Sequence, residues 1–266
     1  MKALLKTERQ TLTLPETAIG LTAVVAAMPE ELAPLVALIP SLRGRKVRPG
    51  NPLQGRLGNA ELLLACTGEG REHALRETAA LLDSHPVDLL LGLGTAGGLT
   101  PSLGPGTLVV ASSIRDGEAP GPEPDRSWVE RALALPGTLD GTVLTSERIL
   151  CSAAEKAAAH SRLAPVGPAV VDLESAAFAV AARDAAVPCL IVRAICDAAE
   201  DDLPIDLNLC RGEDGRIDRF AVVRKTVFSP GAAWQLLRLR KQVALASQEL
   251  ARFVVALLQE EDRGRD

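Results

Sequence analysis

The stretch VVDLESAA at residues 170–177 decides the predicted fold, together with VPCLIVRAICD at residues 187–197. Each is an apolar run bounded by turn signals, which predicts a strand covered on both faces. The residues between them predict an Ala-rich helix opened by Glu174, with an apolar side made of Phe178, Ala181 and Ala185. Parallel strands joined by a helix end on one edge of a sheet, where ligands bind in α/β proteins. We therefore expect Glu174 and Asp197 to face one cleft.

The composition predicts a single globular domain without a nucleic-acid partner. The chain has 266 residues, 47% hydrophobic and 24% charged, which is ample for one large domain with its own core. Its net charge is −5, with both signs mixed throughout, so a broad attraction to nucleic acid is not expected. Aromatic residues make up 2%, with no Tyr, which argues against the stacking platforms of single-strand binders.

Cysteine and histidine usage predicts a reducing compartment and no metal. The five cysteines form no CxxC pair, which predicts reduced thiols in a cytoplasmic protein. None of the three histidines has metal-ligand spacing, so we expect neither a metal nor a cofactor. Residues 1–20 lack a continuous apolar stretch and predict a leader that is neither signal peptide nor anchor. Residues 21–266 are expected to form the single domain.

Patterning predicts further strands and helices along the chain. Strands are expected at 21–27, 54–57, 61–66, 87–93, 107–111 and 143–146, with a hairpin around Gly58-Asn59. Helices are expected from Pro29, over 71–83 and over about 152–161. Residues 116–125 predict a loop, and residues 201–241 a C-terminal elaboration. The chain ends in a long predicted helix with one apolar face packed on the body: Leu236, Leu239, Val243, Ala246, Leu250, Phe253 and Leu257.

Two glycine-rich segments follow predicted strands. The run at 94–98 predicts a turn with open backbone N–H groups, which would suit an anion or a hydroxyl-rich ligand. The sequence TGEG at 67–70 is similar. A tight connection without a ligand is the simpler interpretation of either one, whereas two such turns after neighbouring strands favour a site.

Three acids have both a structural and a chemical interpretation. Glu31 could complement the dipole of the helix it starts. Glu174 could be an acid of a helical first turn, and Asp197 a cap. Their shared location at strand ends favours chemistry, because hydrolysis of a glycosidic bond needs separate acidic groups for water activation and leaving-group protonation.

Four ordered motifs resemble those of the nucleoside phosphorylase/nucleosidase superfamily: AMPEE at 27–31, GTAGGL at 94–99, VDLESA at 171–176 and RAICD at 193–197. The general resemblance is closest to the methylthioadenosine/S-adenosylhomocysteine nucleosidases and covers about residues 20–200. It implies a three-layer α/β/α sandwich around a twisted mixed β-sheet. It also implies a homodimer that acts on a small-molecule nucleoside and needs no cofactor.

The resemblance implies catalytic roles by position. Glu31 matches the acid that activates the hydrolytic water, and Arg193 matches the arginine beside that water. Asp197 matches the acid that protonates N7 of a purine leaving group. The first loop holds a carboxylate where phosphorylases place a phosphate-gripping arginine, so hydrolysis is favoured over phosphorolysis.

The resemblance also implies substrate contacts. Glu174 matches the carboxylate that holds the ribose hydroxyls, and Leu173 stands where the family usually has Met under the sugar. The segment Thr95, Ala96 and Gly97 borders the ribose, with Thr95 in place of a Ser. In the base-binding loop, Ile149 replaces the usual Phe beside Leu150. Contact with the base is therefore expected to be aliphatic.

The C-terminal third leaves alternatives open. Residues 203–208, 213–216 and 220–241 resemble hopanoid-associated nucleosidases, which implies an adenosylated lipid as substrate. Apolar and basic residues alternate in 219–241, a mixture suited to peripheral contact with an anionic membrane. A dimer or lid element explains the same residues. A phosphorylase and a catalytically idle binding module are the other functional alternatives.

Overall fold

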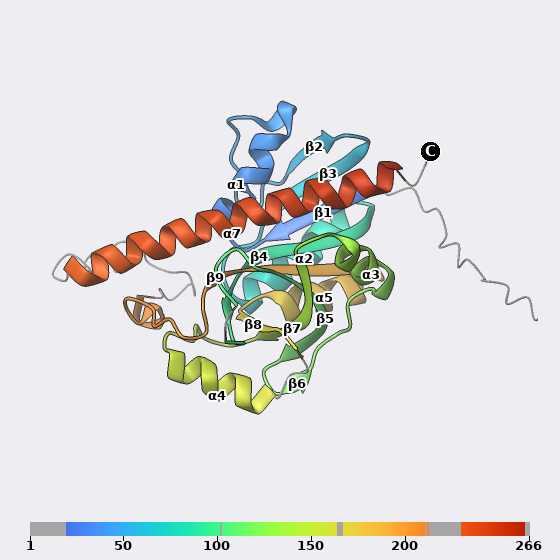
Figure 1. The fold of residues 1–266 in the computed structure, drawn as a ribbon. Coiled ribbons are helices and arrows are strands. Elements are labelled where there is room, and N and C mark those ends of the chain that lie inside the picture. Colours follow the sequence, from blue (N-terminus) through green and yellow to red (C-terminus); the bar gives the residue numbers. More distant parts are fainter. Residues whose placement is uncertain (1–19, 102, 164–166, 211, 213–229, 264–266) are drawn as a thin grey trace, which may run out of the picture.

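The computed structural model describes residues 20–101, 103–163, 167–210, 212 and 230–263. These residues form a nine-stranded mixed sheet with helices on both faces (Figure 1). The strand order is β2-β3-β1-β4-β8-β7-β5-β6, and β9 pairs with both β4 and β5. The expected α/β/α class is confirmed. The predicted leader and most of the segment between 211 and 229 lie outside the described residues.

The strands are β1 (Leu21–Ala26), β2 (Leu53–Leu57), β3 (Ala60–Cys66), β4 (Val87–Gly98), β5 (Leu108–Asp116), β6 (Ala119–Pro120), β7 (Thr138–Thr145), β8 (Ala169–Asp172) and β9 (Cys189–Asp197). The helices are α1 (Pro29–Leu38), η1 (Pro40–Leu42), α2 (Arg71–Ser84), α3 (Arg126–Ala134), α4 (Ala153–Leu163), α5 (Ser175–Asp184), η2 (Leu207–Cys210) and α7 (Pro230–Arg263). Most predicted elements appear within a few residues of their expected bounds.

The predicted hairpin and the first predicted helix are confirmed. β2 and β3 pair antiparallel around Gly58, whose φ of 59° is the left-handed conformation that a tight hairpin turn requires. Pro29 opens α1, where its missing N–H costs no hydrogen bond. The predicted apolar residues of this helix are buried: Leu32, Leu35, Val36 and Ile39.

The predicted parallel βαβ unit at β8, α5 and β9 is wrong. β8 runs parallel to β7 and β7 parallel to β5, whereas β9 runs antiparallel to β5. β8 and β9 therefore point in opposite directions. Because β8 also pairs with β4, the strands β4, β9, β5, β7 and β8 pair in a closed ring. Gly97 of β4 pairs with Val171 and with Asp197, so the ends of β8 and β9 still meet, on the two sides of one glycine.

The predicted turn at 94–98 is also wrong, because β4 continues through Gly98 and pairs with β9 as far as Asp197. Small residues here let a buried side chain cross the strand. A Cβ atom on Gly94 would lie 2.1 Å from Nη1 of Arg193. The glycines therefore serve close packing rather than a turn.

Two further expectations need correction. Residues 116–125 are not entirely loop, since β5 extends to Asp116 and β6 follows it. The helix α3, which was not predicted, begins after Asp125. The side chain of Asp125 caps it by accepting from the N–H groups of Ser127 and Trp128. Ala185 is exposed because it caps α5 instead of continuing its apolar face.

Two hydrophobic cores flank the sheet. One joins the sheet to α1 and α7, and the other joins it to α2 and α5. The predicted stripe of α7 is divided between two environments. Ala246, Leu250, Phe253 and Leu257 are buried in the first core, whereas Leu236, Leu239 and Val243 are only half-buried. None of the described helices is both long and apolar enough to span a bilayer.

Candidate functional site

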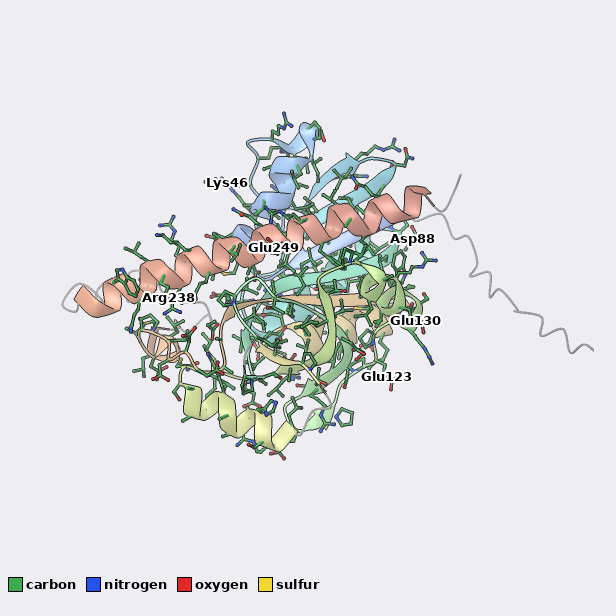
Figure 2. The ribbon with its side chains drawn as sticks, in the orientation of Figure 1. Lys46, Asp88, Glu123, Glu130, Arg238 and Glu249 are labelled. Atoms are coloured by element: carbon green, nitrogen blue, oxygen red, sulfur yellow. The ribbon has the colours of Figure 1, made fainter. Side chains whose placement is uncertain are left out.

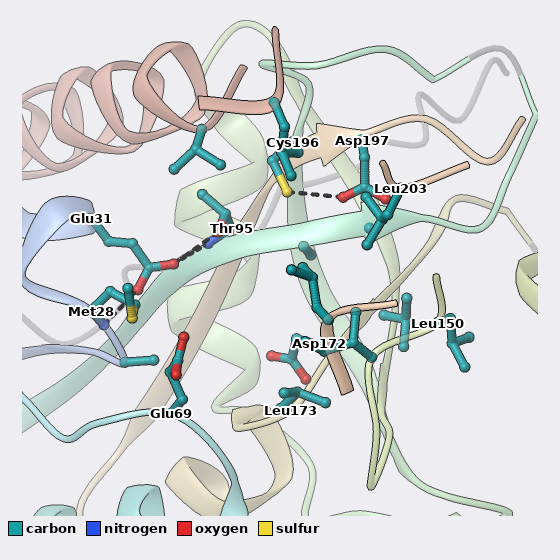
Figure 3. Close-up of a pocket in the computed structure, with 18 of the residues that line it drawn as sticks. Met28, Glu31, Glu69, Thr95, Leu150, Asp172, Leu173, Cys196, Asp197 and Leu203 are labelled. Carbon is teal, nitrogen blue, oxygen red and sulfur yellow. Dashed lines mark hydrogen bonds between the residues drawn. The ribbon is translucent and has the colours of Figure 1, made fainter. Parts of the chain in front are cut away.

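A cavity of about 680 Å³ lies where β4, β8 and β9 end (Figure 3). Its lining also comes from the start of α1, the loop at 148–150 and the first half of α7. The structure brings all the sequence-predicted site residues to this lining except Arg193: Glu31, Thr95, Ala96, Gly97, Ile149, Leu150, Leu173, Glu174 and Asp197. Residues that are far apart in sequence therefore share one cavity.

Glu31 is fixed by hydrogen bonds to both of its carboxyl oxygens (Figure 3). Oε1 accepts from the backbone N–H of Thr95 at 2.7 Å and from its hydroxyl at 3.0 Å. Oε2 accepts from the N–H of Met28 at 3.0 Å, which caps the start of α1. Burial raises the pKa of Glu31 by more than these hydrogen bonds and the charge of Arg193 lower it. The carboxyl group therefore caps α1 and is held in place at the cavity.

Arg193 is not part of the cavity lining and is 1% exposed. Its Nε donates to Oδ2 of Asp172 at 2.6 Å and to Oγ of Ser175 at 2.9 Å. Its Nη1 and Oε1 of Glu31 both lie within 3.3 Å of the position that a Cβ atom on Gly94 would occupy. The Nη2 group has no acceptor among the described residues. The guanidinium therefore adjoins Glu31 and keeps a donor unused by these residues.

Glu174 caps the start of α5 and is 8% exposed. Its Oε1 accepts from the N–H of Gly70 at 2.8 Å. Burial raises the pKa of Glu174 to about 8, and the negative charge of Asp172 adds to this effect, while Arg193 and the Gly70 N–H oppose it. At pH 7 the carboxyl is mostly protonated, so it can donate a hydrogen bond as well as accept one.

The glycine-rich segment at 67–70 does not present the open N–H groups expected of it. The N–H groups of Thr67 and Gly68 donate to the carbonyls of Ala26 and Ala27, at 3.0 and 2.9 Å. With Gly70 bonded to Glu174, this segment ties β1 and α5 together.

Asp197 contacts a lysine that the sequence analysis did not identify as a site residue. Nζ of Lys156, on α4, donates to Oδ2 of Asp197. The thiol of Cys196 donates to Oδ1 at 3.0 Å (Figure 3). Burial, with the charge of Asp197 next in effect, raises the pKa of Cys196 well above its ordinary value, which keeps the thiol protonated. Lys156 is 0% exposed. Lysine is rarely buried, and nothing in the sequence of this Ala-rich helix indicates that Lys156 faces the protein interior.

Asp172 and its partners form the second group that the sequence did not identify. Oδ1 of Asp172 accepts from the hydroxyl of Thr145 at 2.9 Å, and Oδ2 accepts from the hydroxyl of Ser175 at 2.6 Å. Oγ1 of Thr145 in turn accepts from the N–H of Ala176 at 2.9 Å. The network anchors the guanidinium of Arg193 beside the cavity, which Asp172 itself lines. Its only sequence signal is a polar residue, Asp172, at the end of an apolar strand.

The rest of the lining is predominantly aliphatic. It includes Leu203 and Leu207 after β9, and Leu236, Leu239 and Val243 on α7. Arg148, at the rim, is paired with Glu155 at 2.6 Å. Within the described residues, no group of three or more His, Cys, Asp or Glu side chains could hold a metal ion. The cavity therefore combines carboxyl groups from several segments with an apolar wall on α7.

Comparisons with known proteins identify the family of the chain. The model of the family described as "Phosphorylase superfamily" matches residues 22–226. A 5′-methylthioadenosine/S-adenosylhomocysteine nucleosidase from Shewanella loihica is 25% identical over 207 residues, which covers 70% of this chain and 89% of that protein.

Two solved structures have a similar fold. A nucleosidase of the same name from Helicobacter pylori superposes with a TM-score of 0.69 at 18% identity, covering 92% of this chain and 100% of that one. The futalosine hydrolase of H. pylori superposes with a TM-score of 0.68 at 18% identity, covering 91% and 98%. At these identities the likeness concerns the fold alone.

Proposed function

Because the chain belongs to the phosphorylase superfamily, we propose that its cavity hydrolyses the N-ribosidic bond of a 5′-modified, adenosine-type purine nucleoside. The carrying observation is that Glu31, Glu174 and Asp197, from three distant segments, are buried carboxyl groups around one cavity. The similarity to proteins named as methylthioadenosine/S-adenosylhomocysteine nucleosidases supports the reaction type. The products are a free base and a ribosyl sugar.

In the proposed reaction, Asp197 donates a proton to N7 of the purine as the bond between C1′ and N9 breaks. The bonding electrons leave with the base, and the sugar acquires oxocarbenium character. A water attacks C1′ and passes a proton to Glu31, whose raised pKa makes it a better acceptor than an ordinary carboxylate. Arg193, which adjoins Glu31 but does not line the cavity, acts on that water through the Glu31 carboxyl group. Glu174, as a neutral acid, exchanges hydrogen bonds with the ribose hydroxyls.

Substrate positioning falls to the remaining predicted residues in this proposal. Thr95, Ala96 and Gly97 border the ribose from β4, and Leu173 lies under the sugar. Ile149 and Leu150 give the base an aliphatic neighbour. These roles rest on position in the cavity and on the resemblance of the motifs.

Hydrolysis fits the charges at the water side better than phosphorolysis does. The lining near the start of α1 carries Glu30 and Glu31, and Glu69 adds a third carboxyl group to the same cavity. A phosphate dianion would meet repulsion there. The test is turnover with and without phosphate. We expect a free sugar in both cases, whereas phosphate-dependent formation of a sugar 1-phosphate would assign the chain to the phosphorylases.

The 5′ substituent and the base define a second experiment. Methylthioadenosine, S-adenosylhomocysteine, a futalosine-like nucleoside and an adenosylated lipid should be compared, with release of adenine or hypoxanthine as the readout. The apolar wall on α7 favours an apolar 5′ group. Binding without release of base from any of them would instead support an idle binding module.

Assembly and location stay predictions: a homodimer in the cytoplasm, with peripheral membrane contact through residues 219–241. Trp234 and Leu237 are 65% and 58% exposed on α7, which favours such contact, whereas Phe220 and Phe228 lie outside the described residues. If the segment meets membrane, changing Phe220 and Phe228 to Ser should reduce sedimentation with anionic liposomes while the melting temperature stays unchanged. If the intact protein does not sediment with such liposomes, the segment has a purely structural role.

A further inference from the structure

We propose that Lys156 is a positioning residue for leaving-group protonation, acting through Asp197. The inference rests on the proposed function and adds a residue to it. Lys156 is fully buried on α4 and does not line the cavity. Its side chain reaches the carboxyl group that the proposed reaction uses as an acid, and the two residues are 41 positions apart in sequence.

The ammonium group of Lys156 has its three N–H bonds committed. Nζ donates to Oδ2 of Asp197, to the carbonyl of Ala198 at 2.8 Å and to the carbonyl of Asp201 at 3.0 Å. An ammonium has three donors, so none remains for a substrate. Lys156 therefore cannot contact the base itself. It fixes both the carboxyl group and the turn that follows β9.

This contact determines which oxygen of Asp197 transfers the proton to the purine base. Oδ2 is held by the ammonium, whereas the described neighbour that donates to Oδ1 is the thiol of Cys196, a weak donor. Once N7 has taken the proton, its N–H can donate to Oδ1 in place of the thiol more readily than it could displace the ammonium from Oδ2. The proton therefore leaves from Oδ1, while Lys156 keeps the carboxyl plane fixed through Oδ2.

The charge of Lys156 also matters during the transfer. When Asp197 gives its proton to N7, a carboxylate forms in a site that is 7% exposed. An unpaired carboxylate is costly in such surroundings, and an adjacent ammonium compensates it. An apolar side chain would fill the same volume beside the buried Ala159 but would leave the new charge unpaired.

The experiment is a double-mutant cycle between Lys156 and Asp197, with kcat and KM measured on the best nucleoside of the panel. Lys156→Met should lower kcat by about a hundredfold, the usual contribution of general acid catalysis, and change KM by less than about threefold. In an Asp197→Asn background, Lys156→Met should cause no further loss, because its effect passes through the acid. Lys46→Met, at an exposed position on another part of the molecule (Figure 2), serves as the control.

Each outcome separates the two proposals. If the wild type cleaves no purine nucleoside, the proposed function fails and this inference fails with it. If the wild type is active and Lys156→Met retains its kcat, only the role of Lys156 is overturned. If Lys156→Met does not fold, Asp197→Asn is compared with the double variant, which removes both charges. Equal activity supports the inference, and a further loss in the double variant contradicts it.

Discussion

The side-chain amide of Asn208 pairs with both backbone groups of Ile149. Its Nδ2 donates to the carbonyl of Ile149 at 2.9 Å, and its Oδ1 accepts from the N–H of Ile149 at 2.9 Å. A nearby bond joins the same two segments, from the N–H of Leu203 to the carbonyl of Cys151 at 2.8 Å. The loop beside the proposed base site is therefore held by the segment that follows β9.

Removing this pairing should weaken substrate binding more than chemistry. Asn208→Leu loses two hydrogen bonds, each worth about 1 kcal/mol, so we expect KM to rise on the order of tenfold with kcat changed only a few-fold. Asn208→Asp keeps the acceptor for the Ile149 N–H, so its KM should lie between those of the wild type and Asn208→Leu. Steady-state kinetics on the best substrate measures this, and an unchanged KM would show that the loop holds its position without Asn208.

Asp197→Asn should reduce turnover by about a hundredfold or more, because an amide cannot donate the proton that the leaving base needs. The amide oxygen can still accept from Lys156, so the fold and the substrate affinity should be nearly preserved. The measurements are kcat, KM and the melting temperature. Full activity of the Asn variant would remove Asp197 from the mechanism.

Gly94→Ala should damage both stability and activity. The added methyl group would lie 2.1 Å from Nη1 of Arg193 and 3.3 Å from Oε1 of Glu31. Overpacking of this kind costs about 1–3 kcal/mol, and each kcal/mol lowers the melting temperature by about 2–4 °C in a domain of this size.

Gly104→Ala is the matched control for this change, since no atom lies within 4 Å of its added Cβ. Its melting temperature and activity should match the wild type. A Gly94→Ala protein that is as active as the control would mean that Arg193 can move without consequence.

Glu174→Gln should change how stability depends on pH. The pKa of Glu174 rises from 4.5 to about 8 on folding. Between these values the unfolded chain has released a proton that the folded protein keeps, so the free energy of unfolding of the wild type falls as pH rises. Gln does not titrate. The variant should therefore gain stability relative to the wild type from pH 4.5 to 8, on the order of a few kcal/mol.

Denaturant unfolding of both proteins across this pH range measures the difference. A constant gap between them would contradict the pH dependence. Because the Gln amide keeps an acceptor for the Gly70 N–H and a donor in nearly the geometry of a neutral carboxylic acid, the same variant should bind nucleosides with similar affinity.

Local patterns in the sequence were sufficient for most elements, because each depends on its own periodicity. The strands at β1, β3 and β4 and the helix α2 follow directly from apolar runs and from steps of three and four. The resemblance likewise identified site residues that, with the exception of Arg193, line the cavity. Local patterns could not predict the relative direction of the strands. β8 and β9 run in opposite directions because of their pairing with β4 and β5, which no local pattern encodes.

The missed site residues have a common physical cause. Lys156 and Asp172 are charged residues whose burial is offset by partners distant in sequence, Asp197 in one case and Arg193 in the other. Because Lys and Asp are mostly exposed in folded proteins, residue type alone predicts that Lys156 and Asp172 lie at the surface. Each pair comes together only in the tertiary fold, where α4 brings Lys156 to β9 and where β8 and β9 bring Asp172 to Arg193. The glycines at 94 and 97 were misread for the same reason, since the neighbours that they accommodate arrive from β9.

The division of α7 has a consequence for redesign. At 1.5 Å per residue its 34 residues span about 51 Å, and Glu249 lies on the anchored part while Arg238 lies on the part that reaches the cavity (Figure 2). Leu250 and Phe253 hold the helix in the core, whereas Leu236 and Leu239 only border the cavity. We therefore expect substitutions at 236 and 239 to change the shape of the cavity without loosening the helix from the core.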